Sequence, residues 1–124
     1  MNDSRVVRPD PGLEHLTPEG CYILESWNDP GDPELSIARA RVAPGATTRL
    51  HRLRGVQERY LIVTGRGRVW AGDHPPAPVN PGDVVVIPPG VAQRIANTGD
   101  CDLMFYALCT PRFTPDCYED IDPS

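Results

Sequence analysis

The chain contains no lysine, since all 12 of its basic residues are arginine. Without a side-chain amine the protein cannot form a Schiff base with a carbonyl substrate, so that class of covalent catalysis is excluded. The formal net charge is −5, and no basic tail is present. Nucleic acid is therefore not an expected partner, because binding to phosphate depends on clustered positive charge.

Long hydrophobic runs are also absent. No segment approaches the roughly 18 apolar residues that a membrane helix needs. The opening stretch MNDSRVVRPDPGLEHL lacks the hydrophobic region of a signal peptide. The four cysteines show no CxxC spacing, which argues against a zinc knuckle or a redox motif. We expect a cytoplasmic protein with free thiols and no contact with a membrane.

The length of 124 residues, with 40% hydrophobic content, suits one domain with a single core. The 11 glycines and 15 prolines are too many for long helices, and they separate short apolar runs as in an all-β sandwich or barrel. Strands are predicted at 21–27, 34–45, 48–53, 57–65, 66–72, 83–90, 92–99 and 102–110. We expect an N-terminal arm over residues 1–20, a barrel over 21–110, and a C-terminal strap or tail over 111–124.

Two spaced motifs resemble those of the cupin superfamily. The first family motif is G(X)5HXH(X)3–4E(X)6G, where X is any residue. Its matching residues here are Gly45, His51, Glu58 and Gly65. The second family motif is G(X)5PXG(X)2H(X)3N, and its matching residues here are Gly82, Pro88, Gly90 and Asn97. Leu53 and Gln93 stand at the two remaining positions, where the family has histidine. The resemblance implies a cupin double-stranded β-helix, which is a jelly-roll barrel.

In the family, both replaced positions are metal ligands. The resemblance therefore implies a reduced ligand set of His51, Glu58 and Gln93 for a divalent ion such as Fe, Mn, Ni or Zn. An amide oxygen is a neutral, weak ligand, so this set predicts a weakly held metal with open positions for a substrate. The corresponding function is an enzyme that acts on a small oxygenated or carboxylated metabolite, as an oxygenase, isomerase, cyclase or lyase.

A metal-free site is the alternative. Burial would raise the pKa of Glu58, and His51 with Glu58 would then form an acid and base pair for an isomerase. The same pocket would equally suit a module that only binds or senses a small molecule. The sequence leaves these alternatives open.

Three more residues are candidates for the pocket. Residues two apart on a strand share a face, so Arg49 is expected beside His51 as an anchor for an anionic substrate, and Leu53 as a pocket wall. Tyr60 follows Glu58 by the same spacing and is a candidate catalytic hydrogen-bond donor. We also expect a homodimer, because pairing would hide exposed strand edges.

Overall fold

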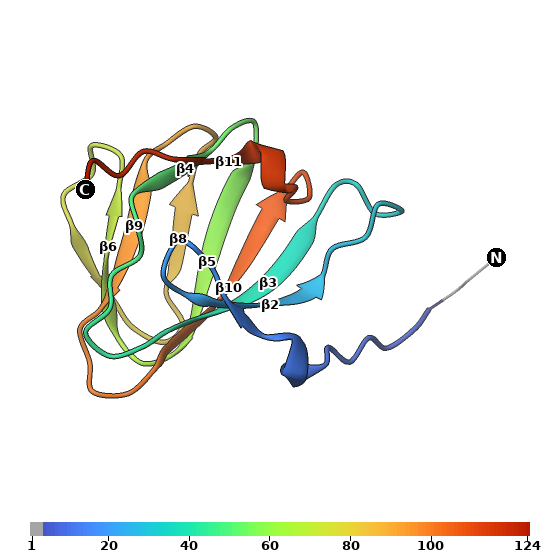
Figure 1. The fold of residues 1–124 in the computed structure, drawn as a ribbon, viewed down its shortest axis with the longest axis horizontal. Coiled ribbons are helices and arrows are strands. Elements are labelled where there is room, and N and C mark those ends of the chain that lie inside the picture. Colours follow the sequence, from blue (N-terminus) through green and yellow to red (C-terminus); the bar gives the residue numbers. More distant parts are fainter. Residues whose placement is uncertain (1–3) are drawn as a thin grey trace.

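The computed structural model describes residues 4–124, which form two antiparallel sheets facing one another (Figure 1). The six-stranded sheet has the order β1-β2-β3-β10-β5-β8, and the five-stranded sheet has the order β11-β4-β9-β6-β7. The strands are β1 (His15–Leu16), β2 (Tyr22–Trp27), β3 (Ser36–Val42), β4 (His51–Leu53), β5 (Gln57–Thr64), β6 (Gly67–Ala71), β7 (Ala77–Val79), β8 (Val84–Ile87), β9 (Gln93–Asn97), β10 (Leu103–Thr110) and β11 (Tyr118–Asp120). Two 3-10 turns, η1 (Pro11–Leu13) and η2 (Pro115–Cys117), complete the fold.

The alternation of side chains decides which face of each strand enters the core. In β10, buried and half-buried residues alternate along the whole strand, and Leu103, Phe105 and Ala107 point inward. The core fills the space between the sheets, and its most completely buried members include Val42, Ile95 and Leu103. The predicted all-β jelly-roll barrel is confirmed. No helix among residues 4–124 has the length and apolar character needed to cross a membrane.

Every strand predicted from the sequence has a counterpart, and three strands were not predicted. The first of these, β1, is only two residues long. The second, β7, lies in the proline-rich loop, where Pro78 is tolerated because β7 is the edge strand of its sheet. The third, β11, lies in the C-terminal segment and pairs with β4, opposite His51 and Leu53.

The two terminal segments are fastened to the barrel by ion pairs. Glu14 of the N-terminal segment lies 2.6 Å from Arg41 and 3.2 Å from Arg39, which both project from β3. These guanidinium groups lower the pKa of the Glu14 carboxyl. In the C-terminal segment, the side chain of Asp122 accepts from the backbone N–H of Leu50 at 2.9 Å. The segment therefore lies against the strand that carries His51.

Glycine is required by close packing at one of the motif positions. Gly65 has a φ of +80°, and a Cβ built there would lie 2.6 Å from the backbone oxygen of Asp102. Any side chain would collide with the backbone that leads into β10. Gly65 thus allows the tight β5–β6 turn to pack against this backbone, which agrees with its place in the family motif.

An apolar patch remains on the outer face of the six-stranded sheet. It consists of Leu61 and Val63 on β5 and Val84 and Val86 on β8, and the two β8 residues are each 57% exposed. Strand β8 is also an edge of its sheet. This patch is the surface that the predicted homodimer would cover.

Candidate functional site

A cavity of about 50 Å³ lies between the two sheets, and side chains of the first sequence motif line it. The five-stranded sheet contributes His51 and Leu53 from β4, and the six-stranded sheet contributes Glu58 and Tyr60 from β5. Gln93 on β9 pairs directly with His51. The structure thus brings together all of the predicted site residues except Arg49.

His51 is held in one orientation by a hydrogen bond at Nδ1 and by stacking of its ring. The side chain is buried, and its Nδ1 lies 2.7 Å from the carbonyl oxygen of Arg49. Because a carbonyl oxygen can only accept, Nδ1 is the donor of this hydrogen bond. The ring also stacks on Tyr118 of β11, with 5.2 Å between the centroids. These contacts leave Nε2 as the nitrogen available for chemistry.

A second acidic residue, Glu19, faces that nitrogen. Its Oε2 lies 3.4 Å from Nε2 of His51, and its backbone oxygen accepts from the N–H of Arg49 at 2.8 Å. Glu19 precedes β2 and belongs to the segment predicted as an arm. The sequence pattern did not identify this residue, because its position depends on how the polar segment folds back against β4. A protonated His51 can donate to Arg49 and Glu19 at the same time.

Gln93 is part of a buried hydrogen-bonded chain. The Tyr60 hydroxyl donates to Oε1 of Gln93 in a short hydrogen bond. Since the amide oxygen is engaged by Tyr60, the amide nitrogen is left as the donor of this side chain, and Gln93 acts to lower the pKa of Glu58. Tyr60 therefore fixes the orientation of the Gln93 amide, and burial raises the pKa of Tyr60 well above its usual value.

Glu58 is a buried carboxyl with one unsatisfied oxygen. Burial raises the pKa of Glu58 to about 7, and the negative charge of Glu19 adds to the effect, while Gln93 and Cys109 act in the opposite direction. Oε2 lies 3.8 Å from the Cys109 sulfur, whereas Oε1 has no hydrogen-bond partner among residues 4–124. A carboxyl of this kind exchanges its proton near neutral pH, which suits general acid and base chemistry.

The residues present do not fit a resident divalent metal ion. Leu53 offers no donor atom, and the only oxygen of the Gln93 amide already accepts from Tyr60. In the described part of the chain, no three His, Cys, Asp or Glu side chains are grouped so that they could hold an ion. His51, Glu19 and Glu58 all line the cavity, but they are not gathered around one point as the three protein ligands of a catalytic transition-metal site are.

Arg49 points away from the cavity. Its Nε lies 2.7 Å from Asp120, and an Nη donates to the backbone oxygen of Ser124 at 3.0 Å. The contact with the Arg49 guanidinium stabilises the Asp120 carboxylate and lowers its pKa. The sequence predicted Arg49 on the same face as His51, but β4 begins only at His51 and the acidic C-terminal segment attracts the guanidinium.

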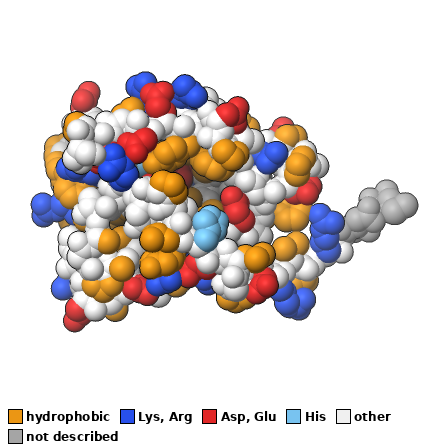
Figure 2. Space-filling view, viewed as in Figure 1, with side chains coloured by type: hydrophobic (Ala, Val, Ile, Leu, Met, Phe, Trp, Pro, Cys, Tyr) orange, Lys and Arg blue, Asp and Glu red, His pale blue; other side chains and the backbone are white. Residues whose placement is uncertain are grey.

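Two further hollows adjoin the cavity and open to the surface. One measures about 160 Å³ and the other about 220 Å³, and Glu19 and Phe113 line both of them as well as the cavity itself. Glu58 lines the cavity and the first hollow, so the buried carboxyl is reached from outside past Glu19. Figure 2 shows a hollow near the middle of one face, bordered by a histidine, an acidic side chain and hydrophobic side chains.

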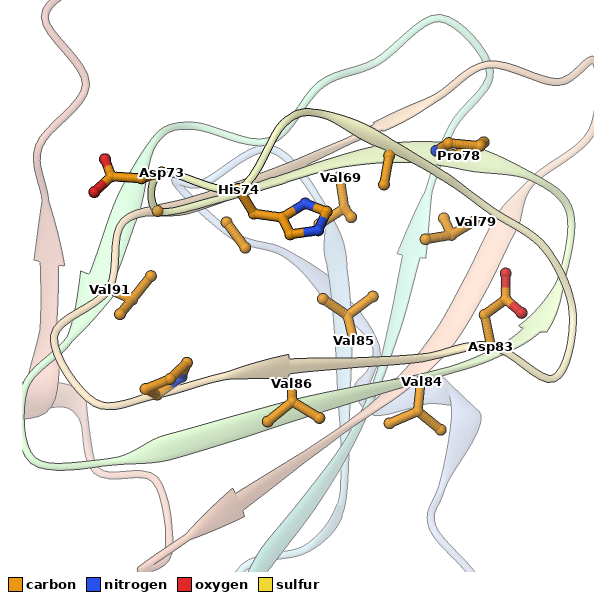
Figure 3. Close-up of a pocket in the computed structure, with 14 residues that line it drawn as sticks. Val69, Asp73, His74, Pro78, Val79, Asp83, Val84, Val85, Val86 and Val91 are labelled. Carbon is orange, nitrogen blue, oxygen red and sulfur yellow. The ribbon is translucent and has the colours of Figure 1, made fainter.

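A larger hollow of about 680 Å³ lies elsewhere, between β7 and β8 (Figure 3). Valine and alanine side chains make up most of its wall, and its polar members are Asp73, His74 and Asp83. None of the motif residues that could perform chemistry lines it. We therefore assign the functional site to the smaller cavity, where buried polar groups converge.

The fold and the cavity define a double-stranded β-helix protein with a polar site inside the barrel. Residues 38–109 match the family described as "Cupin domain". The chain therefore belongs to the cupin family.

Three relatives place the chain within that family. It is 37% identical over 72 residues to an "Oxalate-binding protein" of Thermotoga maritima, a match that covers 58% of this chain and only 59% of that protein. A predicted oxalate decarboxylase of Thermotoga maritima has a TM-score of 0.73 at 25% identity, covering 86% of this chain and 99% of the other. The oxalate decarboxylase of Bacillus subtilis, which has Mn(II) centres, has a TM-score of 0.75 at 21% identity, covering 89% and 30%. The family thus includes oxalate-binding and oxalate decarboxylase-like relatives of this chain.

Proposed function

We propose that the protein is a metal-independent cupin that transfers protons on a small polar metabolite, as an isomerase does. Glu58 is the acid, and His51 together with Glu19 is the base. What supports this assignment most is the Oε1 atom of Glu58, which is buried, lines the cavity and has no hydrogen-bond partner in the described chain.

The proposed reaction breaks a C–H bond next to a carbonyl or imine carbon. The proton passes to Nε2 of His51 and the C–H electron pair forms a C=C bond. The π pair of the carbonyl or imine moves to its oxygen or nitrogen, where Glu58 supplies a proton. The imidazolium that forms donates to the Arg49 carbonyl oxygen and to Glu19, which lie 2.7 Å and 3.4 Å away. Return of a proton to a different position completes an isomerisation, and no oxidant or reductant is consumed.

Each remaining site residue has a supporting role in this proposal. Tyr60 fixes the Gln93 amide by its hydrogen bond, and Gln93 lowers the pKa of Glu58. Leu53 provides an apolar wall where a metal ligand stands in other cupins, and its burial keeps this side of the cavity dry. A dry wall favours the neutral form of Glu58, which is the form that can donate a proton.

A second candidate function is suggested by the relatives. They include an oxalate-binding protein and an oxalate decarboxylase with Mn(II) centres, which supports binding of a small dicarboxylate together with a divalent ion. Against this stands the donor set of the cavity, where Leu53 and the engaged amide of Gln93 replace two imidazoles. The two functions differ in their response to added Mn²⁺, which only the second requires.

Solvent proton exchange tests the proposal. A panel of small hydroxy, keto and amino compounds is incubated with the protein in D₂O containing EDTA, and loss of C–H signals is followed by NMR. We expect exchange by the wild type and none by His51→Ala or Glu58→Gln, while Glu34→Gln, at an exposed position between β2 and β3, retains it. Exchange that appears only after EDTA is replaced by Mn²⁺ would favour the second candidate.

A further inference from the structure

The carboxyl and imidazole groups that line the cavity and its two adjoining hollows outnumber any cationic partner for an anion. Three carboxyl groups line them, those of Glu19, Glu25 and Glu58, together with the imidazoles of His15 and His51. No arginine of residues 4–124 lines any of the three, and the chain has no lysine.

Two arginines that lie close in sequence to the lining residues His51 and Phe113 are engaged elsewhere. Arg49 pairs with Asp120 at 2.7 Å, and Arg112 donates to the Asn28 side chain at 2.9 Å. An anionic ligand would therefore enter a cavity that offers it no guanidinium or ammonium partner. Transfer of an unpaired carboxylate from water into such a site is costly.

Glu19 already occupies the position where an anionic ligand would meet His51. Its carboxylate lies 3.4 Å from Nε2, which is the nitrogen not engaged by the Arg49 carbonyl oxygen. A ligand carboxylate would have to displace Glu19, and the displaced charge would remain at the opening of the cavity.

Glu58, in contrast, lacks a hydrogen-bond donor that a ligand could supply. Its Oε1 is an acceptor without a donor in the part of the chain described, and the residue is only 8% exposed. A ligand that carries N–H donors would satisfy this oxygen, and a positive charge on the ligand would also be attracted by Glu19.

We propose that the cavity binds a small molecule carrying a protonated amine, and that Glu19 is the specificity residue that excludes carboxylate ligands. An ammonium group has three donors and can bond both Glu58 and the Glu19 side chain at once. The hollow of about 160 Å³ beside the cavity limits the rest of the ligand to a few non-hydrogen atoms. The inference deepens the proposed function, because it names the ligand class of the same site.

Size-matched probes test this inference without requiring turnover. Ethanolamine, ethylene glycol and glycolate have nearly the same size and are cationic, neutral and anionic, and oxalate adds the dicarboxylate. Each is titrated into the ¹⁵N-labelled full chain in EDTA, and chemical-shift changes of Glu19, His51 and Glu58 are followed. We expect saturable changes with ethanolamine and none with glycolate or oxalate.

Two variants assign the effect to Glu19. Glu19→Gln removes the charge at nearly constant size, and we expect about tenfold weaker ethanolamine binding together with measurable glycolate binding. Glu34→Gln removes an exposed carboxylate between β2 and β3 and should leave the ethanolamine affinity unchanged. Retention of the native amide spectrum shows that each variant is folded.

Three results would overturn the inference: saturable oxalate binding by the wild type in EDTA, equal ethanolamine affinity in Glu19→Gln, or no saturable change with any probe. None of these would by itself remove the proton-transfer proposal, since that is tested by solvent exchange on compounds of every charge. Conversely, ethanolamine binding without any proton exchange would leave a binding module and reject the enzyme.

Discussion

The Nε2 atom of His51 lies 3.4 Å from Oε2 of Glu19, so a residue that precedes the first long strand completes the site inside the barrel. The backbone hydrogen bond from Arg49 N–H to Glu19 oxygen, at 2.8 Å, holds the two segments together. The N-terminal segment consequently contributes a carboxylate to the lining of the candidate site.

Stability should depend on the protonation of Glu58. Its pKa is about 7 in the folded protein against an ordinary value of 4.5, so the folded state binds this proton more tightly than the unfolded chain. The resulting stabilisation is complete below pH 4.5 and is lost as the pH rises through 7, by about 3 kcal/mol in total. We expect Glu58→Gln to unfold at a higher temperature than the wild type at pH 8.

Calorimetric unfolding of both proteins at pH 5.5 and pH 8 measures this difference. Glu14→Gln is the matched control, because the pKa of Glu14 is lowered and its contribution changes with pH in the opposite direction. Identical pH profiles for wild type and Glu58→Gln would show that Glu58 titrates normally.

Removing the Tyr60 hydroxyl should destabilise the fold and loosen Glu58. Tyr60→Phe leaves the buried Oε1 of Gln93 without its donor, which costs about 1 to 3 kcal/mol. Tyr106→Phe on the outer face of β10 is the control, and its free energy of unfolding should be within about 0.5 kcal/mol of that of the wild type. Chemical denaturation of both variants checks the prediction, and equal losses of stability would count against a specific role for Tyr60.

Restoring the two missing imidazoles should create a metal site. The double variant Leu53→His, Gln93→His adds two nitrogen ligands to His51 and Glu58, and we expect its affinity for Zn²⁺ or Mn²⁺ to exceed that of the wild type by at least about 100-fold. Titration calorimetry in chelator-free buffer measures both proteins. Tight metal binding by the wild type would support the second candidate function.

The exposed patch on β5 and β8 predicts the assembly state. Two copies related by a two-fold axis can bury Leu61, Val63, Val84 and Val86 against one another, which hides the apolar surface and the β8 edge. We expect the wild type to be a dimer by light scattering and Val86→Glu to be a monomer. Leu13→Glu, which changes a residue that is 69% exposed outside the patch, should remain dimeric. A monomeric wild type at micromolar concentration would contradict the prediction.

The spacing of the two sequence motifs was sufficient to predict most of the fold and the residues at the centre of the candidate site. Gly65 at the β5–β6 turn, and His51 and Glu58 on facing sheets, are positions that the local pattern of turns and alternating strands can predict. Glu19 and β11 were not predictable in this way, because each owes its position to contacts with β4 made by a distant polar segment. Arg49 was placed by its strand parity, but the competing carboxylate of Asp120 determines where its side chain lies.

The protonation of Glu58 tests the metal-independent account most directly. The carboxyl carbon of Glu58, labelled with ¹³C and assigned by comparison with Glu58→Gln, is titrated by NMR from pH 4 to pH 9, with EDTA and again with equimolar Zn²⁺. We predict a midpoint near 7 that is the same in both series. A carboxylate already ionised at pH 5, or a midpoint that falls when Zn²⁺ is present, would contradict the account and favour a metal ion bound at Glu58.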